Sequence, residues 1–359
     1  MMLPNHKKEK PFTGFAGFGG GGLGLFNGAS AVKKYLDEVF STDIWEGTGS
    51  ARTINTGLDM SGEGGLVWLK RRNGATNPMI YDTGRGTYHL ETDGNGAQSQ
   101  FSQFLTGYTS NGFNLGTASN INGVGTDSVG WSFRKAPGFF DTVTYSGNGV
   151  AGREISHSLG STPGMVIVKR TNGSDNWTVQ HRSLGGTKSL YLNLTSSEDT
   201  SSTEWNDTTA TSTAFTVGTS GKTNAVGDDY VAYIFAHDDQ VFGTGSNEAV
   251  INCGSLNISS QGTVEVNLGW EAQFVLLKPS SFTGRWFMFD TMRGMAVNSF
   301  EWLYANDTDA AEAKTYQAVY PTPTGFGFNP ADNGQLGDGT YIYMAIRRPH
   351  KPPSAATEV

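Results

Sequence analysis

Cysteine is almost absent from this sequence, with Cys253 the only one in 359 residues. An internal disulfide framework and a multi-cysteine metal site are therefore excluded, because each needs at least two thiols. No helix N-terminus or neighbouring histidine in the sequence would activate Cys253 as a nucleophile. We expect it to be a buried structural thiol on a strand, in a fold held together by burial of apolar side chains.

Charge and long apolar runs are also scarce. Charged residues make up 16% of the chain, and 33 acidic residues against 25 basic ones give a net charge of −8. Binding to a phosphate backbone requires a basic face, so we expect no nucleic-acid partner. No apolar run approaches the roughly 18 residues of a membrane-spanning helix, and residues 1–11 lack the apolar segment of a secretory signal. The sequence therefore predicts neither membrane insertion nor Sec-dependent export.

Motifs for catalysis and cofactor binding are missing as well. The sequence has no G-x-S-x-G, no H-E-x-x-H and no phosphate-binding loop. A G-x-G-x-x-G match at Gly19, Gly21 and Gly24 has no strand before it, which a dinucleotide site requires. We predict no enzyme activity, no cofactor and no metal.

Two acidic patterns leave minor alternatives open. Pairs at 228–229 and 238–239, and the segment 332–339, could supply oxygen ligands for calcium at strand ends, although Asp and Asn turns explain them better. A glycosidase would need two converging carboxylates. Asp82 and Asp290 occupy equivalent positions in different parts of the chain, with His181 at the position between them, and are interpreted as turn residues.

Glycine is abundant, with 49 residues, and it dominates the first part of the chain. Residues 11–28 are mostly glycine and phenylalanine, a composition that forms no stable helix by itself. We interpret this segment as an arm that becomes ordered on a partner, or else as a flexible tail. Its candidate anchors are Phe12, Phe15 and Phe18.

A single amphipathic helix is predicted from Ser30 to Thr42. Apolar residues recur there at helical spacing, and Ser30 is placed as the N-cap. The apolar face either packs on the β-structure that follows or docks on a partner, packing being the commoner role of such faces. The candidate docking residues on this face are Val32, Tyr35, Leu36, Val39 and Phe40.

Everything after Thr42 is organised as three copies of one unit, spaced by about 100 residues. A strand-like segment ending in lysine occurs three times, at Leu66 to Lys70, Val166 to Lys169 and Phe274 to Lys278. Three further blocks follow in the same order: 80–86, 179–185 and 288–294; then 112–116, 214–218 and 325–329; then 128–133, 230–235 and 341–346. Four matched blocks in one order predict a duplicated structural module.

The expected fold class is all-β. Large residues alternate in the last block with the period of a strand that buries one face, and the turns are rich in Gly, Asn, Ser and Thr. We predict three tandem β-sandwich-like repeat modules with a Gly/Phe-rich N-terminal arm and one short amphipathic helix. The predicted boundaries are residues 1–45 for the arm and docking helix, 46–140, 141–250 and 251–350 for the repeats, and 351–359 for a proline-containing tail or linker.

Exposed aromatic rings could form sugar-stacking surfaces near the loops. The candidate glycan-contact residues are Trp177, Trp205, Trp286 and Trp302. Core packing is the alternative for each of them.

Four segments carry a family resemblance: Lys33 to Thr42, Gly62 to Lys70, Trp131 to Asp141 and His157 to Gly164. They resemble a family of virion structural proteins of tailed bacteriophages of marine bacteria, usually described as tail fibre or tail-associated proteins. The resemblance covers nearly the whole chain. It implies a structural role in the virion in support of host attachment, with no catalytic residues to carry over.

The sequence thus predicts a phage tail fibre or tail-associated protein, assembled in the host cytoplasm and located in the virion. Its expected partners are other virion proteins, further copies of itself in a homotrimer as fibre proteins in general imply, and host surface glycans. A capsid decoration or head-fibre protein is the first alternative, and an enzyme that degrades host polysaccharide is the second.

Overall fold

The computed structural model describes residues 35–259, 262–295, 300–314, 319–329 and 336–349. The described chain is built almost entirely of antiparallel strands, which confirms the all-β class. All of these residues belong to one compact unit, Lys33–Val359. Phe12, Phe15, Phe18 and Val32 of the predicted arm and helix, and the tail 351–359, lie outside the described residues.

Repeat 1 comprises nine strands, preceded by the 3-10 helix η1 (Leu36–Glu38) and interrupted by the one-turn helix α1 (Ser119–Asn122). The strands are β1 (Phe40–Glu46), β2 (Arg52–Asn55), β3 (Gly65–Arg71), β4 (Met79–Asp82), β5 (Tyr88–Glu91), β6 (Ser99–Gln100), β7 (Leu105–Thr109), β8 (Gly112–Leu115) and β9 (Asp127–Arg134).

Repeat 2 comprises eight strands and the one-turn helix α2 (Ser202–Trp205). The strands are β10 (Phe140–Ser146), β11 (Arg153–Ser156), β12 (Met165–Arg170), β13 (Thr178–His181), β14 (Lys188–Tyr191), β15 (Asp199–Thr200), β16 (Ala214–Val217) and β17 (Asp229–Phe235).

The described residues of repeat 3 form nine strands and the 3-10 helix η2 (Thr291–Arg293). The strands are β18 (Ile251–Ile258), β19 (Val264–Asn267), β20 (Ala272–Pro279), β21 (Phe287–Asp290), β22 (Phe300–Tyr304), β23 (Glu312–Lys314), β24 (Val319–Thr322), β25 (Gly325–Phe328) and β26 (Gly339–Arg347).

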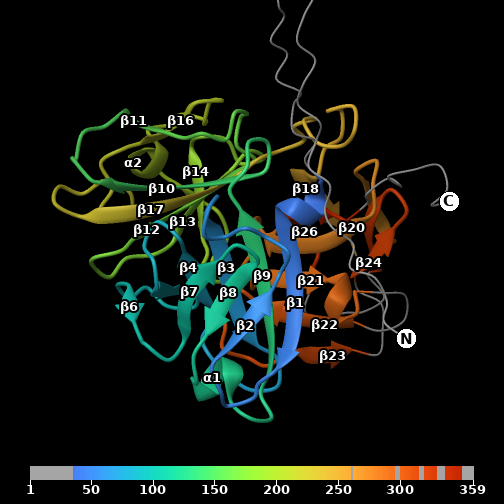
Figure 1. The fold of residues 1–359 in the computed structure, drawn as a ribbon. Coiled ribbons are helices and arrows are strands. Elements are labelled where there is room, and N and C mark those ends of the chain that lie inside the picture. The colour runs from blue at the N-terminus through green and yellow to red at the C-terminus, as the bar shows by residue number, and fades with distance from the viewer. Residues whose placement is uncertain (1–34, 260–261, 296–299, 315–318, 330–335, 350–359) are drawn as a thin grey trace, which may run out of the picture. The chain divides into compact units, whose positions relative to one another are not determined.

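The three repeats share the topology of their large sheets, and the small sheet of repeat 2 has two strands where the others have three (Figure 1). Each has a six-stranded sheet in the same order, β1-β9-β3-β4-β5-β6, β10-β17-β12-β13-β14-β15 and β18-β26-β20-β21-β22-β23. A small second sheet completes each sandwich-like unit: β2-β8-β7, β11-β16 and β19-β25-β24. The matched sequence blocks therefore correspond to matched strands.

The large sheets are buried on both faces, whereas the sequence predicted strands with one buried face. In β3, Leu66 and Trp68 point into a core shared by the repeats, while Val67 and Leu69 face the small sheet of their own repeat. The closing strands β9, β17 and β26 are likewise buried over nearly their whole length. The second covered face results from contact with the other repeats.

Aromatic rings from all three repeats meet in the shared core. The ring of Phe133 in repeat 1 lies 5.5 Å from that of Phe235 in repeat 2 and 6.3 Å from that of Phe274 in repeat 3. Aromatic pairs at such distances add about 0.5–1.5 kcal/mol each beyond their area burial. The repeats are therefore packed around a common centre, which a tandem string of separate modules would lack.

The predicted helix over 30–42 is wrong within the described residues. Only Leu36–Glu38 are helical, as a 3-10 turn, and Phe40 begins β1, which pairs with β9 from Phe40↔Phe133 to Glu46↔Asp127. Strand pairing overrides the helical spacing of the apolar residues, as tertiary context often does. The repeat boundary expected at residue 46 falls at the end of β1, so the first sheet begins earlier, at Phe40.

The proposed docking face on that helix is not a surface. Leu36, Val39 and Phe40 are almost completely buried in the shared core, and Tyr35 is half-buried. The Phe40 ring packs 5.1 Å from Phe133 and 5.9 Å from Phe274. Leu36, Val39 and Phe40 therefore belong to the core that joins the repeats and are not accessible to a partner, which corrects the docking prediction for these three residues.

Candidate functional site at the seams between repeats

The recurring lysines connect neighbouring repeats. Lys70, Lys169 and Lys278 end the apolar run of β3, β12 and β20, and all three are fully buried. The boundary between repeats 1 and 2 is called here the first seam, that between repeats 2 and 3 the second seam, and that between repeats 3 and 1 the third seam. One lysine lies at each seam.

Each lysine donates hydrogen bonds to backbone carbonyls on both sides of its seam. Lys278 Nζ donates to Gly284 O in its own repeat at 2.8 Å, and to Thr195 O and Ser196 O of repeat 2 at 3.1 and 2.8 Å. Lys169 Nζ reaches Asn95 O of repeat 1 at 3.2 Å.

Lys70 Nζ completes the set by reaching Asp307 O of repeat 3 at 2.6 Å. Repeat 3 thus binds repeat 2, repeat 2 binds repeat 1, and repeat 1 binds repeat 3. The three contacts form a closed cycle.

Burial lowers the pKa of these ammonium groups. Desolvation lowers the pKa of Lys278 to about 7, and those of Lys70 and Lys169 to about 8. At Lys70 the carboxylates of Asp93, Asp307 and Asp309 oppose the shift, and at Lys169 that of Asp175 does. Desolvation is the cause of the shift at Lys278, with no carboxylate opposing it, so the pKa of Lys278 falls furthest of the three.

Buried Asp–Arg pairs mark the first and third seams. Asp82 ends β4, and its Oδ2 accepts from Arg85 Nε at 2.6 Å and from the Tyr233 hydroxyl of repeat 2 at 2.8 Å. Asp290 ends β21, and its Oδ2 accepts from Arg293 Nε at 2.6 Å and from Trp131 Nε1 of repeat 1 at 3.0 Å. These carboxylates serve two separate seams, so they do not form a converging catalytic pair.

The second seam has a different chemistry. His181 replaces the aspartate and Leu184 replaces the arginine. His181 Nε2 lies 3.1 Å from the Tyr343 carbonyl of repeat 3, and because a carbonyl only accepts, Nε2 carries the proton. The Ser183 backbone N–H donates to Nδ1 at 3.2 Å. Burial lowers the pKa of this imidazole to about 3, so it is neutral with both nitrogens occupied.

The residue that faces this position from the neighbouring repeat also differs at the second seam. The registers of β3 with β9, β12 with β17, and β20 with β26 make Trp131, Tyr233 and Met344 equivalent. Trp and Tyr donate to an aspartate, whereas Met344, which has no N–H or O–H to donate, faces the seam where histidine has replaced aspartate. At the second seam, both the aspartate acceptor and the Trp or Tyr donor of the other seams have therefore been replaced.

The four candidate glycan-contact tryptophans are buried, which contradicts that prediction and leaves core packing as their role. Trp177, Trp205, Trp286 and Trp302 are each at most 1% exposed. Trp177 Nε1 donates across the first seam to Glu91 O, and Trp286 Nε1 donates across the second seam to Tyr191 O. Trp205 and Trp302 instead pack against aromatic rings of their own repeats, including Phe215 and Phe287.

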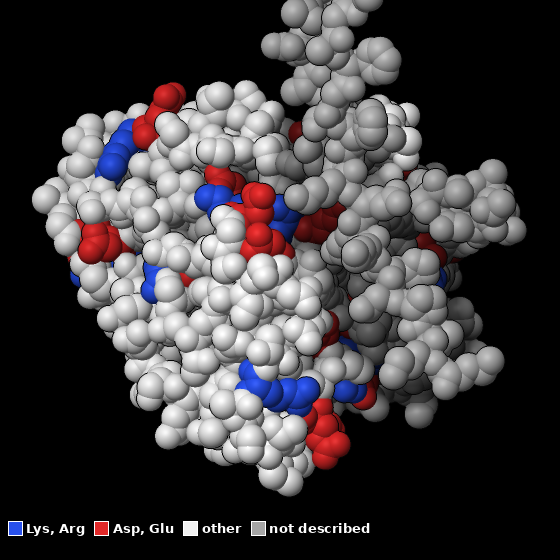
Figure 2. Space-filling view, viewed as in Figure 1, with Lys and Arg blue, Asp and Glu red and all other residues white. Residues whose placement is uncertain are grey.

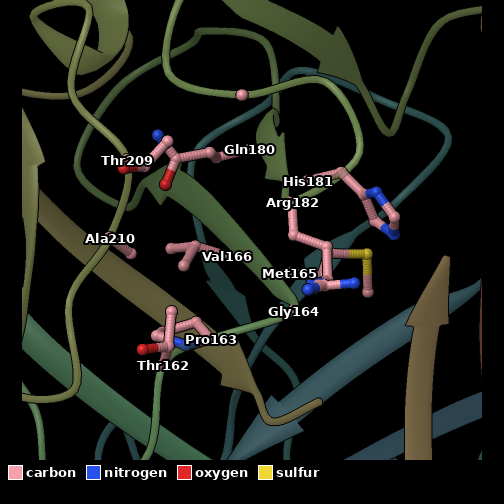
Figure 3. A pocket seen from close by; sticks show the side chains of 11 residues that line it. Thr162, Pro163, Gly164, Met165, Val166, Gln180, His181, Arg182, Thr209 and Ala210 are labelled. Carbon is pink, nitrogen blue, oxygen red and sulfur yellow. The ribbon is translucent and has the colours of Figure 1, made fainter. Parts of the chain in front are cut away.

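A cavity of about 160 Å³ lies in repeat 2 beside the end of β13 (Figure 3). Gly164, Met165, Val166, Arg182 and Thr209 contribute to its lining. The His181 ring is turned away from Val166 and Ala210 in this view and is bonded to repeat 3 instead. No carboxylate of the described residues lines the cavity, so it lacks the groups needed for acid–base catalysis by carboxylates.

Cys253 is buried on β18, as the sequence predicted. Its Sγ lies 3.7 Å from the Ala236 carbonyl, and desolvation raises the pKa of the thiol far above its usual range. A Cβ added at Gly164 would lie 2.7 Å from this sulfur, so the glycine is required for the close approach. A thiol in this position is protonated and inaccessible to substrate.

The acidic turns do not assemble a cation site in the described part of the chain. No group of three His, Cys, Asp or Glu side chains there could hold a metal ion. Asp228 pairs with Arg170 at 2.6 Å, and Asp229 accepts from the Ser146 hydroxyl at 2.7 Å. Residues 332–335 lie outside the described residues.

None of the described helices is long and apolar enough to cross a bilayer.

Sequence reasoning missed the seams, although their signals were present. The repeated lysine at the end of an apolar strand and the repeated Asp-Thr-x-Arg were both visible in the sequence. A lysine that recurs at a position of high burial is unusual enough to indicate a polar partner. What the sequence could not supply was the identity of that partner, which belongs to another repeat.

Three homologous sandwich-like units joined by buried polar seams define an all-β repeat protein. The model of a family described as a domain of unknown function, DUF7483, matches residues 37–349, and the chain belongs to this family. No curated protein matches the chain.

Proposed function

We propose that this protein is a structural component of a phage virion, a tail fibre or tail-associated protein that docks on the particle and supports host attachment. The observation that carries the proposal is the closed cycle of seams. Two sets of buried polar side chains make contacts between repeats: Lys70, Lys169 and Lys278 near the ends of β3, β12 and β20, and Asp82, His181 and Asp290 at the ends of β4, β13 and β21. A unit stiffened in this way suits a load-bearing role.

The surface is consistent with assembly among proteins. Acidic and basic side chains are sparse and intermixed on the face shown in Figure 2, whose described part is largely uncharged. Nucleic-acid binding would require an extended basic face. The resemblance of residues 33–42, 62–70, 131–141 and 157–164 to phage virion proteins points to the same role.

The partners under this proposal are neighbouring virion proteins and further copies of the chain. We retain the homotrimer expected of fibre proteins. Location in the virion, after assembly in the host cytoplasm, follows from the same role.

Immunogold electron microscopy of purified particles tests the proposal. Antibodies raised against the recombinant chain should decorate the tail, and light scattering of the isolated protein should give the mass of a trimer. Gold on the head would favour a capsid decoration or head-fibre protein. Absence of the protein from particles would overturn a structural role altogether.

A further inference from the structure

An open groove of about 410 Å³ runs along the first seam, between repeats 1 and 2. Repeat 1 contributes Tyr88 and Gln98, and repeat 2 contributes Thr144, Ser146 and Asp229. Its volume lies within the range of about 300–1,000 Å³ typical of small-molecule sites. The groove exists because the two repeats meet along the edges of their large sheets.

The same groove recurs at the second seam, where its chemistry differs. A cavity of about 250 Å³ there is lined by Lys188, Glu198, Ser255 and Thr340, among others. Backbone contacts establish the equivalence, because Gln98 N donates to Thr171 O as Glu198 N donates to Ser280 O. The backbone fold therefore forms a groove at both seams, and the lining side chains determine which ligand each groove can bind.

Tyr88 distinguishes the first seam from the other two. The hairpin registers make Tyr88, Lys188 and Glu301 equivalent. Lys188 is paired with Glu198, and Glu301 is paired across the third seam with Arg72 at 2.8 Å. Tyr88 instead presents an aromatic ring that is 39% exposed, and its hydroxyl forms no hydrogen bond with another described residue.

The polar groups around Tyr88 are fixed in orientation. Gln98 Oε1 accepts from Arg85 Nη1 at 3.2 Å, which leaves the amide nitrogen as the donor available to the groove. Asp229 Oδ1 accepts from Ser146 Oγ at 2.7 Å, which leaves Oδ2 as an acceptor. One donor and one acceptor are thus held on opposite repeats, beside an aromatic face.

The charge of the groove disfavours anions. Arg85 also lines the groove, but its charge is neutralised by Asp82, whose Oδ2 lies 2.6 Å from its Nη2, and it donates further to Gln98 and Tyr233. Asp229 adds a carboxylate. A ligand with an apolar C–H face for the ring and hydroxyls for the polar walls satisfies all of these groups.

We propose that the first-seam groove binds an uncharged saccharide, which stacks on Tyr88 and bridges Gln98 and Asp229. This inference deepens the proposed attachment function by naming a ligand class and a place for it. It also moves glycan contact from the buried tryptophans to a tyrosine that the sequence did not single out.

Saturation-transfer NMR with the full-length chain tests the proposal. The probes are four uncharged disaccharides (lactose, maltose, cellobiose and N,N′-diacetylchitobiose), with glucose 6-phosphate as an anionic comparison. We expect saturation transfer to at least one disaccharide and none to the phosphate. Tyr88→Ala and Tyr88→Lys, the second of which copies the side chain of the second seam, should each weaken binding at least tenfold.

Lys188→Ala is the matched control, because it alters the equivalent position at the second seam and should leave binding unchanged. Thermal unfolding of each variant confirms that the fold is retained. Failure of all four disaccharides to bind, or undiminished binding by folded Tyr88 variants, would overturn the saccharide site. Particle labelling is a separate measurement, so failure of saccharide binding would not contradict a location in the virion. Likewise, absence of the protein from particles would not contradict saccharide binding by the isolated chain.

Discussion

At the scale of the residue, buried cations define this protein. Lys278 lies in the interior with three backbone carbonyls as its hydrogen-bond partners, and its pKa falls to about 7 as a result of desolvation. Removing one partner of such an arrangement leaves the others unsatisfied, which costs more than the contact itself contributes. The lysine is therefore held in place by the carbonyls of two repeats.

Lys278→Met should lower the free energy of unfolding by about 2–4 kcal/mol, because the apolar side chain leaves three buried carbonyls without a donor. Urea denaturation measures the change. The comparison is Lys188→Met, which removes a partly exposed ion pair with Glu198 and should cost less than about 1 kcal/mol. Equal stability of Lys278→Met and the native protein would show that the ammonium does not stabilise the second seam.

His181 should make the protein sensitive to acid. Its pKa is about 3 in the folded state and about 6.5 in an unfolded chain, so between these values only the unfolded chain binds the proton. Its contribution to stability is therefore fully present above about pH 6.5 and declines by about 1.4 kcal/mol per pH unit as the pH falls towards 3. His181→Gln, which keeps an N–H donor for the Tyr343 carbonyl, should remove this part of the slope. Urea unfolding at pH 7 and pH 5 compares the two proteins, and identical slopes would contradict the assignment.

At the scale of the element, the sequence predicted strands more reliably than their surroundings. The segments ending in Lys70, Lys169 and Lys278 fall inside β3, β12 and β20, because an apolar run with β-branched residues identifies a strand by itself. Burial of both faces and the partner of each lysine depend on a neighbouring repeat and could not be read from local pattern. The helix expected over 30–42 failed for the same reason, since β9 pairs with Phe40–Glu46.

Phe40→Ala should destabilise the protein by about 3–5 kcal/mol, because it opens a cavity where aromatic rings of repeats 1 and 3 meet. Ile44→Ala is the control on the same strand, since Ile44 is 42% exposed and its loss should change stability by less than about 0.5 kcal/mol. Chemical denaturation distinguishes the two. A small effect of Phe40→Ala would mean that β1 is dispensable and would revive the docking interpretation.

At the scale of the whole Lys33–Val359 unit, the repeats depend on one another. Trp177 of repeat 2 donates a hydrogen bond to the Glu91 carbonyl of repeat 1, and Phe133 packs against rings of both other repeats. The modules resemble separate sandwiches in sequence, whereas their cores are continuous across the seams.

A fragment spanning residues 140–250 should therefore fail to fold cooperatively, because the apolar inner face that the other repeats cover would be exposed to water. The unit as a whole should unfold in a single calorimetric transition. Dispersed amide NMR signals from the isolated fragment, or three resolved heat-capacity peaks from the full chain, would contradict this interdependence.

The unlike chemistry of the second seam has a consequence for how the chain assembles. Three similar repeats could pair in the wrong order, or with repeats of another copy, during folding. If the His181 end of repeat 2 met β9 instead of β26, the Trp131 indole would lose its carboxylate acceptor inside the core. If Asp290 met β26, it would face Met344 with no hydroxyl or indole to bind. Mismatched neighbours would leave buried polar groups without hydrogen-bond partners, which raises the free energy of the wrong arrangement. The different side chains of the second seam therefore favour one order of the three repeats.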